Sequence, residues 1–268
     1  MPELAEVLFA TKAWEKGKGS KILKVETKNT SRVFRELDPA LVKRALQGSS
    51  LQGSETHGKK MLFRFSGEKW LGLHLGMTGW LFEEETAYAT GKHDALILRQ
   101  ADRTLVFRDP RQFGRVLYHK GKDAPEWWNN LPPEVHSDAF TLELVRSILH
   151  RRKRALVKAV LLMQEFFPGI GNWMVDEILW RARIHPAERA GTLSPAKQKA
   201  LWEQTRFVTN GALETVGKRG GDPPDDWLFH VRWKDGGNCP RSGKPLVRET
   251  VAGRTTCWCP SGQRLTKR

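Results

Sequence analysis

The stretch MLFRFSGEKWLGLHL, residues 61–75, contains two mostly apolar runs that are joined by the polar turn SGEK. Short apolar or alternating runs separated by turn residues are typical of consecutive antiparallel strands. Similar runs follow before residue 120, at Ala95 to Leu98, Leu105 to Phe107 and Val116 to Tyr118. The pattern predicts an antiparallel β-sandwich, which we assign to residues 1–122.

The strands are preceded by a segment with a different period. Apolar residues recur at helical intervals at Leu4, Val7, Leu8 and Trp14. We therefore expect a helix between Pro2 and about Gly17. This helix would deliver the N terminus to the edge of the sheet.

The chain after the sandwich divides into a linker and two further regions. Pro and Asn punctuate residues 123–140, which we assign to a linker. Helical periodicity marks residues 141–235, where Ser194 can cap a helix and Pro195 can occupy its first turn. The Gly-rich residues 236–268 contain two β-like runs and predict a hairpin. The expected fold class is α+β.

The composition indicates a partner with many negative charges. The 268 residues carry a formal net charge of +15, and the pI is about 10.0. Lys and Arg side chains that neutralise phosphates release counterions, so nucleic acid is the natural partner. A basic surface that is merely solvated is the alternative explanation.

The sequence also bears on location. It contains no apolar run of about 18 residues and no signal peptide, so we expect no membrane partner and no secretion. Three cysteines, all after residue 238, cannot pair completely and fit a reducing compartment. We expect an intracellular protein, either cytoplasmic and associated with a bacterial nucleoid or located elsewhere in the cell.

The first residues, Met1-Pro2-Glu3, suggest an amine nucleophile. Removal of Met1, which a small following residue favours, would leave the secondary amine of Pro2 beside the Glu3 carboxylate. Amine catalysis needs a nucleophile that is often unprotonated, and an α-amino group titrates well below a lysine side chain. An arbitrary chain start is the alternative for these residues taken alone.

Several segments along nearly the whole chain carry a resemblance to one family. They are PELAEV (residues 2–7), HGKK (57–60), HLGMTG (74–79), DPRQFG (109–114), PGIGN (168–172) with Asp176-Glu177 and Ile184-His185-Pro186 after it, and GRTT (253–256) running into Cys259-Pro260. In this order they resemble motifs of the formamidopyrimidine-DNA glycosylase and endonuclease VIII family. The resemblance implies an N-terminal helix and antiparallel β-sandwich, then a helix-two-turn-helix domain with a C-terminal β-hairpin finger.

The resemblance implies a bifunctional DNA glycosylase and AP lyase of base excision repair, with damaged DNA as its partner. Pro2 would attack C1′ of an extruded nucleotide and form an iminium, and β- and δ-elimination would then cut the strand. Glu3 would act as acid and base, and Glu6 would orient the N terminus. Ala5 and Leu8 replace a Pro and a Glu of the common family start.

Other residues are implied to contact the DNA from the sandwich. Lys59, at the tip of the basic hairpin, would hold a phosphate or assist protonation. Met77, Arg111 and Phe113 match the residues that fill the void left by the extruded base, and a flexible thioether, a planar cation and an aromatic ring suit that task. Gln112 replaces the second Arg of the family's DPRRFG pattern.

The second half of the chain is implied to hold the DNA backbone. The glycines of PGIGN let the backbone turn tightly, and a helix beginning near Trp173 points its first amides at a phosphate. Asn172 is the phosphate ligand implied by the resemblance, and Lys158 matches the position of another. Arg254 corresponds to the phosphate-binding position of the finger.

The finger departs from the family pattern at the metal site. A zinc finger of the C-x2-C…C-x2-C type needs four thiolates, whereas the matching positions here are Cys239, Ser242, Cys259 and Gly262. Ser is a poor zinc ligand and Gly has no side chain, and Cys257 adds at most one further thiol. We expect a zincless finger that is held by packing, with no metal or cofactor.

The substrate is the least determined feature. The segment 217–226 corresponds to a loop that can cap an oxidised purine in the family, and it is short and lacks that motif. This favours oxidised pyrimidines and ring-opened purines. An 8-oxoguanine-preferring glycosylase and a non-catalytic protein that binds DNA lesions remain as alternatives. The family default is a monomer.

Overall fold

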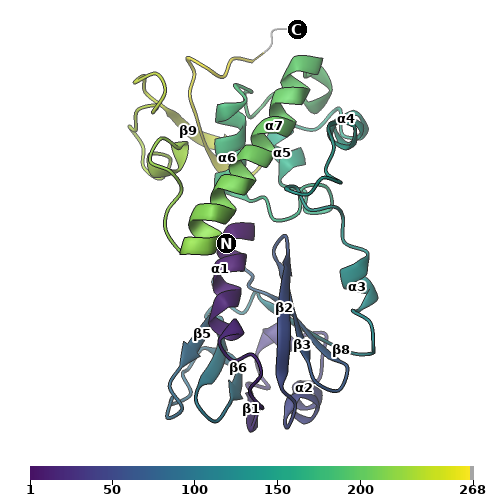
Figure 1. Cartoon of the computed structure of the whole chain (residues 1–268). Helices are drawn as coiled ribbons and strands as arrows, with labels where there is room; N and C mark the ends of the chain where they lie inside the picture. Colours follow the sequence, from purple (N-terminus) through teal and green to yellow (C-terminus); the bar gives the residue numbers. More distant parts are fainter. Residues whose placement is uncertain (266–268) are drawn as a thin grey trace. The chain divides into compact units, whose positions relative to one another are not determined.

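The computed structural model describes residues 1–265. The chain divides into two compact units between Leu131 and Pro132, inside the segment that we assign to a linker. Figure 1 shows the strands of the first unit and the helices of the second. Each unit has a hydrophobic cluster of its own.

The first unit is the expected antiparallel β-sandwich. One sheet has the order β1-β6-β7-β5, with β1 at Lys24–Thr27, β6 at Asp94–Arg99, β7 at Thr104–Arg108 and β5 at Trp80–Glu84. The other has the order β2-β3-β4-β8, with β2 at Leu51–His57, β3 at Lys60–Phe65, β4 at Lys69–His74 and β8 at Arg115–Lys120. All the pairs are antiparallel, which confirms the interpretation of the apolar runs.

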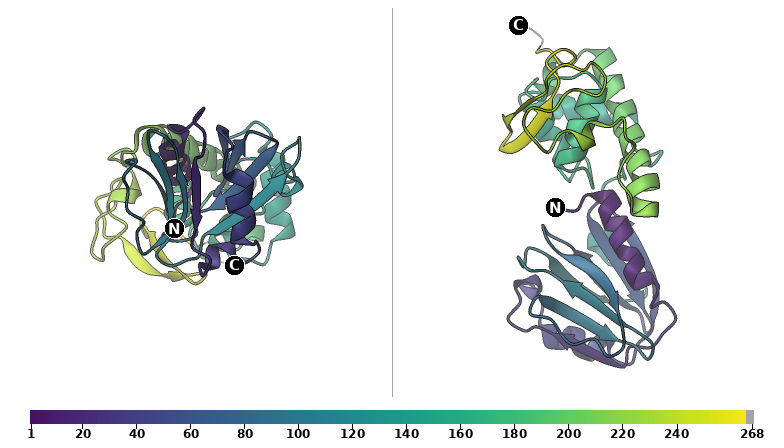
Figure 2. Two further views of the ribbon diagram at one scale, coloured as in Figure 1. Left: turned by 90° about the horizontal axis from the view of Figure 1, so that it is seen from below. Right: turned by 90° about the vertical axis from the view of Figure 1, so that its left-hand side faces the viewer.

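The expected N-terminal helix is α1 (Leu4–Glu15). It contacts β5 and β2, which are edge strands of the two sheets, and Figure 2 shows it lying along the strands. Trp14 anchors it: the indole is fully buried, lies 4.9 Å from the Phe63 ring between centroids, and donates from Nε1 to the Val106 carbonyl at 3.3 Å. The helix therefore starts at a fixed place on the sandwich.

Short helices complete the first unit. They are η1 (Arg32–Phe34), α2 (Pro39–Leu46), whose first turn is capped by Asp38, and α3 (Glu126–Asn129). The indole of Trp127 in α3 packs onto Gly72 of β4, where a Cβ atom would lie 2.4 Å from the ring. The segment after the sandwich thus covers part of the second sheet.

The second unit contains the expected helices and hairpin. Its elements are α4 (Leu142–Arg151), α5 (Val157–Leu161), α6 (Asn172–Arg181), η2 (Ala190–Thr192), α7 (Pro195–Ala212), the π-helical turn η3 (Leu213–Gly217), η4 (Leu228–His230), β9 (Val247–Val251) and β10 (Arg254–Trp258). The Ser194 hydroxyl caps α7 by accepting from the Lys197 amide at 3.3 Å, as its sequence predicts. Strands β9 and β10 pair antiparallel across a turn at Ala252 and Gly253, both with positive φ. Within residues 1–265, no helix is long and apolar enough to span a membrane.

Candidate active site and DNA-contacting surface

The N-terminal residues form a capping box at the start of α1. Glu3 is the N-cap: its carboxylate accepts from the backbone amide of Glu6, and Glu6 Oε2 accepts from the Glu3 amide at 3.2 Å. These reciprocal bonds satisfy two of the free amides that every helix start leaves. Glu3 is only 3% exposed, and Ala5 in the same turn is fully buried. Pro2 therefore precedes a backbone segment whose position is fixed.

Lys59 lies at the tip of the β2–β3 hairpin. Gly58 before it has φ +56°, a conformation that favours glycine, and His57 and Lys60 close the turn. The Lys59 side chain is only 7% exposed. It is close enough to His74, the last residue of β4, to act on its charge state.

His74 is a neutral ring in this basic neighbourhood. Burial, followed by the nearby cations Lys59 and Arg115, lowers the pKa of His74 to about 4. Its Nδ1 accepts from the Gly76 amide at 3.0 Å, and a neutral imidazole has one N–H, so the proton is on Nε2. His74 is therefore a hydrogen-bond donor without charge.

The three residues expected to fill the void in the DNA are all exposed. Met77 is 38% exposed and Phe113 is 47% exposed, and Arg111 is exposed beside them in sequence. The guanidinium of Arg111 lies over the Phe113 ring, 4.9 Å from its centroid. Large apolar side chains on two adjacent loops of a basic protein are available for a partner.

The buried carboxylate of Asp109 holds these two loops together. The Asp109 carboxylate accepts from the Thr78 hydroxyl at 2.8 Å and from the Gly114 amide at 2.7 Å. The Thr78 oxygen in turn accepts from the Arg111 amide at 3.2 Å. A Cβ atom at Gly76 would lie 2.4 Å from the backbone of Phe113, so the loops touch through their backbones.

Gln112, which replaces a cation of the family pattern, has a structural role here. Its backbone has φ +55°, and its side-chain oxygen accepts from the Arg32 amide at 2.9 Å at the start of η1. The amide side chain thus connects the loop to the neighbouring helical turn. Two side chains of the loop, Arg111 and Phe113, stay exposed.

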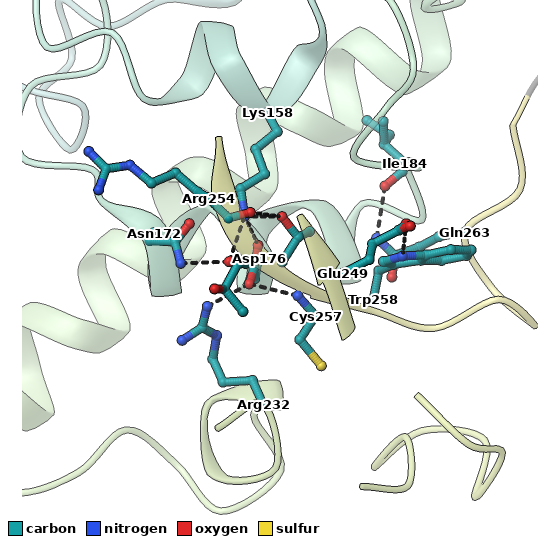
Figure 3. Close-up of polar contacts among 12 residues, drawn as sticks. Lys158, Asn172, Asp176, Ile184, Arg232, Glu249, Arg254, Cys257, Trp258 and Gln263 are labelled. Atoms are coloured by element: carbon teal, nitrogen blue, oxygen red, sulfur yellow. Dashed lines mark hydrogen bonds and ion pairs between the residues drawn. The ribbon is translucent and has the colours of Figure 1, made fainter. Parts of the chain in front are cut away.

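In the second unit, Asn172 begins α6 and contacts the finger. Its Nδ2 donates to the Thr255 carbonyl of β10 at 2.8 Å, whereas its buried Oδ1 has no hydrogen-bond partner among the described residues. Arg254, the residue before Thr255, is exposed. Figure 3 shows the Arg254 side chain extending past Asn172. Asn172 and Arg254, two of the three expected phosphate ligands of this unit, therefore lie close together.

Lys158 requires a correction. We predicted a phosphate ligand, but its side chain is fully buried and its ammonium donates to Asp176 Oδ1 at 2.6 Å, Thr256 Oγ1 at 2.7 Å and the Thr255 carbonyl at 3.3 Å. An ammonium has three donors, and these acceptors match that number. A phosphate would have to displace a buried carboxylate, so the prediction is wrong in this conformation.

Asp176 is the centre of this network (Figure 3). Its Oδ2 accepts from Arg232 Nη2 at 2.6 Å and from the Cys257 amide at 3.0 Å, while Oδ1 binds Lys158. One buried carboxylate thus joins α5, α6, the segment after η4 and strand β10. We name the residues Lys158, Asp176 and Arg232 the finger anchor.

The remaining finger residues do not fit a zinc ion. Trp180 Nε1 donates to Cys239 Sγ at 3.3 Å, and Cys259 Sγ lies 3.5 Å from the Ser242 hydroxyl and 3.1 Å from that of Ser261. Two thiols among hydroxyls do not make the tetrahedral thiolate and imidazole set that structural zinc takes. Residues 1–265 contain no cluster of three or more His, Cys, Asp or Glu side chains suited to a metal.

Some contributing residues escaped sequence reasoning. Asp109 and Asp176 stand inside motifs that we quoted, but nothing local reveals that each ties together segments far apart in sequence. Arg232 carries no motif at all. The available signal was a charged residue within an apolar segment. Asp176 lies among the buried residues of α6, and a buried carboxylate needs a partner.

Comparisons with known proteins agree with this geometry. The family model of the formamidopyrimidine-DNA glycosylase N-terminal domain matches residues 1–116, and that of the H2TH domain of the same family matches residues 131–221. A formamidopyrimidine-DNA glycosylase of Roseiflexus sp. is 36% identical over 276 residues, covering 98% of this chain and 100% of the relative. One of Arabidopsis thaliana is 28% identical and covers 99% of this chain and 71% of the relative.

Solved structures give the same result. The wild-type Lactococcus lactis enzyme, in complex with a DNA that contains an oxidised pyrimidine, matches with a TM-score of 0.89 and 29% identity over 98% of this chain and 100% of that chain. The same organism's enzyme bound to DNA with an abasic site matches with a TM-score of 0.87 and 28% identity over 98% and 99%. The chain belongs to the formamidopyrimidine-DNA glycosylase family.

Proposed function

We propose that this chain, a DNA glycosylase and AP lyase of its family, removes oxidised bases from DNA by covalent catalysis through the Pro2 amine. The observation that carries the proposal is the capping box of α1, in which Glu3 and Glu6 bind each other's backbone amides. Covalent catalysis requires a nucleophile held at a defined place beside an acid or base. The buried Glu3 is covalently attached to Pro2 and meets that requirement.

The bond changes follow from amine chemistry. Once Met1 is removed, the Pro2 nitrogen attacks C1′ of the extruded nucleotide, and the bond from C1′ to the base breaks as the base leaves with the electron pair and takes up a proton. Glu3 then takes the remaining proton from the Pro2 nitrogen and delivers it to the ring oxygen O4′, the C1′–O4′ bond opens, and the freed nitrogen lone pair completes the iminium. Loss of a C2′ proton expels the 3′ phosphate, and a second elimination expels the 5′ phosphate.

Lys59 and the exposed loops support the steps around the chemistry. A cation at the hairpin tip suits a phosphate or the protonation of the leaving base. Met77, Arg111 and Phe113 would occupy the stack after the nucleotide is extruded. In the second unit, Asn172 and Arg254 would hold a backbone phosphate, and the finger anchor would position them.

The substrate class is proposed from the segment after α7. The π-helical turn η3 ends at Gly217, and Trp227 is already buried against the unit, which leaves only a short segment to cover an extruded base. This favours oxidised pyrimidines and ring-opened purines over 8-oxoguanine. The Lactococcus lactis structure with an oxidised pyrimidine in its DNA gives a precedent within the family.

Borohydride trapping tests the mechanism. We expect the purified protein, with Met1 removal verified by intact mass, to form a covalent adduct on a duplex that carries an abasic site. Pro2→Gly preserves Met1 removal and should reduce trapping and strand cleavage by at least about 100-fold. A Pro2→Gly protein that traps DNA at the normal rate would rule out Pro2 as the nucleophile. If the wild type binds the duplex and forms no adduct, the non-catalytic lesion-binding alternative replaces the lyase.

Two further properties are proposed and are simple to measure. Trapping on duplexes with 5-hydroxyuracil, a ring-opened guanine or 8-oxoguanine should be strongest for the first two. We also propose a monomer whose finger folds without zinc, because Ser242 and Gly262 stand where two ligands would be needed. Light scattering would report the mass. Stoichiometric zinc in tag-free protein, found by elemental analysis, would contradict the zincless finger.

A further inference from the structure

A row of cations crosses the second sheet of the sandwich beside the exposed Phe113 loop. In the register of the strands, Lys60 of β3 faces His74 of β4, and His74 faces Arg115 of β8. Facing residues of neighbouring strands share one side of a sheet, with Cβ atoms about 5 Å apart. We name Lys60, His74 and Arg115 the outer row. It places one cation on each side of a neutral hydrogen-bond donor, His74.

The outer row borders a pocket of about 330 Å³. Its lining also includes the aliphatic Leu73 and Leu117, Gly72, and two aromatic residues, Trp127 of α3 and Phe113 of the exposed loop. A side chain at position 72 would collide with the Trp127 indole, so the absence of one admits the ring. The pocket therefore combines a basic rim with aromatic and aliphatic walls.

The charges of the rim are incompletely neutralised within the protein. Glu36 pairs with Arg115 at 2.8 Å, and Arg35, another lining residue, donates to the carbonyls of Arg32 and Gly114. Lys60 forms no ion pair among residues 1–265. Burial, and then the like charge of Arg115, lowers the pKa of Lys60. An anion at the rim would relieve both effects, because it replaces lost hydration and offsets the repulsion between the cations.

We propose that this pocket binds one nucleotide unit of a DNA strand outside the lesion, with its phosphate on Lys60 and Arg115 and its base against Trp127. A phosphodiester is the anion that a DNA-processing enzyme meets at high local concentration. Bases stack on aromatic rings regardless of their identity, so such a site supplies affinity and register without reading sequence. The neutral His74 between the two cations can donate a hydrogen bond and adds no repulsion.

This inference rests on the DNA-directed function proposed above, but its test requires no chemistry at Pro2. The measurement is the equilibrium affinity for a fluorescent duplex with an uncleavable tetrahydrofuran site, titrated at several salt concentrations. Lys60→Met and Arg115→Met should each weaken binding about 5- to 10-fold and reduce the slope of log affinity against log salt by about 0.9. A failure of iminium catalysis would leave these values unchanged, so the two proposals can fail separately.

Arg64→Met provides the matched control. Arg64 is an exposed cation on the same strand and the same sheet face as Lys60, but it does not line the pocket. Its substitution should change affinity less than twofold, whereas an effect as large as that of Lys60→Met would mean that the whole face acts as a diffuse basic surface and would overturn the site. Equal affinity of Lys60→Met and wild type would overturn it too.

Two more arms identify the occupant. Trp127→Leu should weaken duplex binding and Trp127→Phe should restore it, because the ring supplies stacking; full affinity of the Leu variant would refute base contact. Inorganic phosphate and deoxyadenosine monophosphate are then tested as competitors for the duplex. A strand-bound nucleotide predicts weak competition by both at millimolar concentration. Selective competition by the mononucleotide, lost in Lys60→Met, would reassign the pocket to a free nucleotide and overturn the DNA assignment.

Discussion

The Phe113 loop of the first unit and the finger of the second unit are both expected to reach DNA, yet they direct their polar groups differently. In the loop, a buried carboxylate, Asp109, binds only a hydroxyl and a backbone amide, and the cation Arg111 remains exposed. Where the finger is attached to α6, the buried carboxylate of Asp176 takes two cations out of solvent, Lys158 and Arg232. On the finger itself, Arg254 stays exposed.

This difference shows that residue type alone does not tell whether a cation binds a ligand or positions other residues. The resemblance assigns both Lys158 and Arg111 to DNA contact, but only Arg111 can meet a phosphate without breaking a buried ion pair. Burial decides, because separating the partners of a buried ion pair leaves an uncompensated charge in the interior. The anchor should therefore govern stability, and the loop should govern recognition.

The largest expected effect follows removal of the anchor's carboxylate. Asp176→Ala leaves Lys158 and Arg232 buried without a counter-charge, which typically costs about 3–5 kcal/mol. We expect a large loss in the free energy of unfolding, measured by circular dichroism in urea. Asp138→Ala, at an exposed carboxylate that pairs with Arg206, is the control and should leave the midpoint unchanged. Equal urea midpoints for Asp176→Ala and Asp138→Ala would show that the finger anchor does not govern stability.

A smaller effect is expected from the carboxylate that holds the loops. Asp109→Ala removes the acceptor of the exposed Thr78 hydroxyl and of the buried Gly114 amide, and an unsatisfied buried donor costs about 1–3 kcal/mol. Unfolding in urea would show the loss, and affinity for an abasic duplex should fall with it because the loops separate. Asp109→Asn keeps one acceptor and should lie between the wild type and the Ala variant. Wild-type stability of Asp109→Ala would show that the loops do not depend on this carboxylate.

We expect the exposed Phe113 ring to contribute to DNA binding and not to the stability of the fold. Phe113→Ala should change the free energy of unfolding by no more than about 0.5 kcal/mol, because the ring is already 47% exposed. Affinity for an abasic duplex should fall about tenfold. Leu23→Ala, at a side chain that is 55% exposed elsewhere in the unit, controls for lost apolar surface and should bind normally. The loop's role would be refuted if Phe113→Ala bound DNA as well as Leu23→Ala.

The smallest effect is a difference in pH dependence between the units. In the second unit, burial, opposed by Arg181, raises the pKa of Glu177 from 4.5 to about 7. The folded state then binds more protons than the unfolded state between these values, so stability declines as pH rises through that interval. In the first unit, Arg99 beside Glu26 lowers the pKa of Glu26 to about 2, and its stabilisation is lost as pH falls below 4.5.

Urea unfolding at a series of pH values separates these two contributions. Glu177→Gln should flatten the decline between pH 4.5 and 7 and leave the acid side unchanged, whereas Glu26→Gln should flatten the acid side alone. An unaltered decline in Glu177→Gln would show that the Glu177 carboxyl does not retain its proton in the folded state.

Periodicity was sufficient to predict the elements, and spacing alone did not reveal their connections. The strands around residues 61–75 and the capped start of α7 follow from local sequence, because side-chain alternation and a Ser-Pro start act within a few residues. The anchor could not be predicted in this way: Lys158 meets Asp176 and Thr256, which lie 18 and 98 residues away. The prediction of an exposed phosphate ligand at Lys158 rested on the resemblance alone.

The same limit applies to the assigned linker. Its Pro and Asn residues indicate a connection, and the split between the units does fall within it. Nothing local shows that Trp127 packs onto Gly72 or lines a pocket with Lys60. That contact depends on Gly72, and from the sequence alone a glycine in a strand indicates only a residue that weakens the strand. The exposed Met77, Arg111 and Phe113 could be located only through the resemblance.

The way in which strand β10 is attached determines which positions of the finger tolerate substitution. Asn172 and Lys158 bind the Thr255 carbonyl, and Asp176 binds the Cys257 amide, so these contacts read the backbone of the finger. Backbone groups survive almost any substitution. The side chains at positions 242 and 262 take no part in these backbone contacts, so they can change while Arg254 stays where it is.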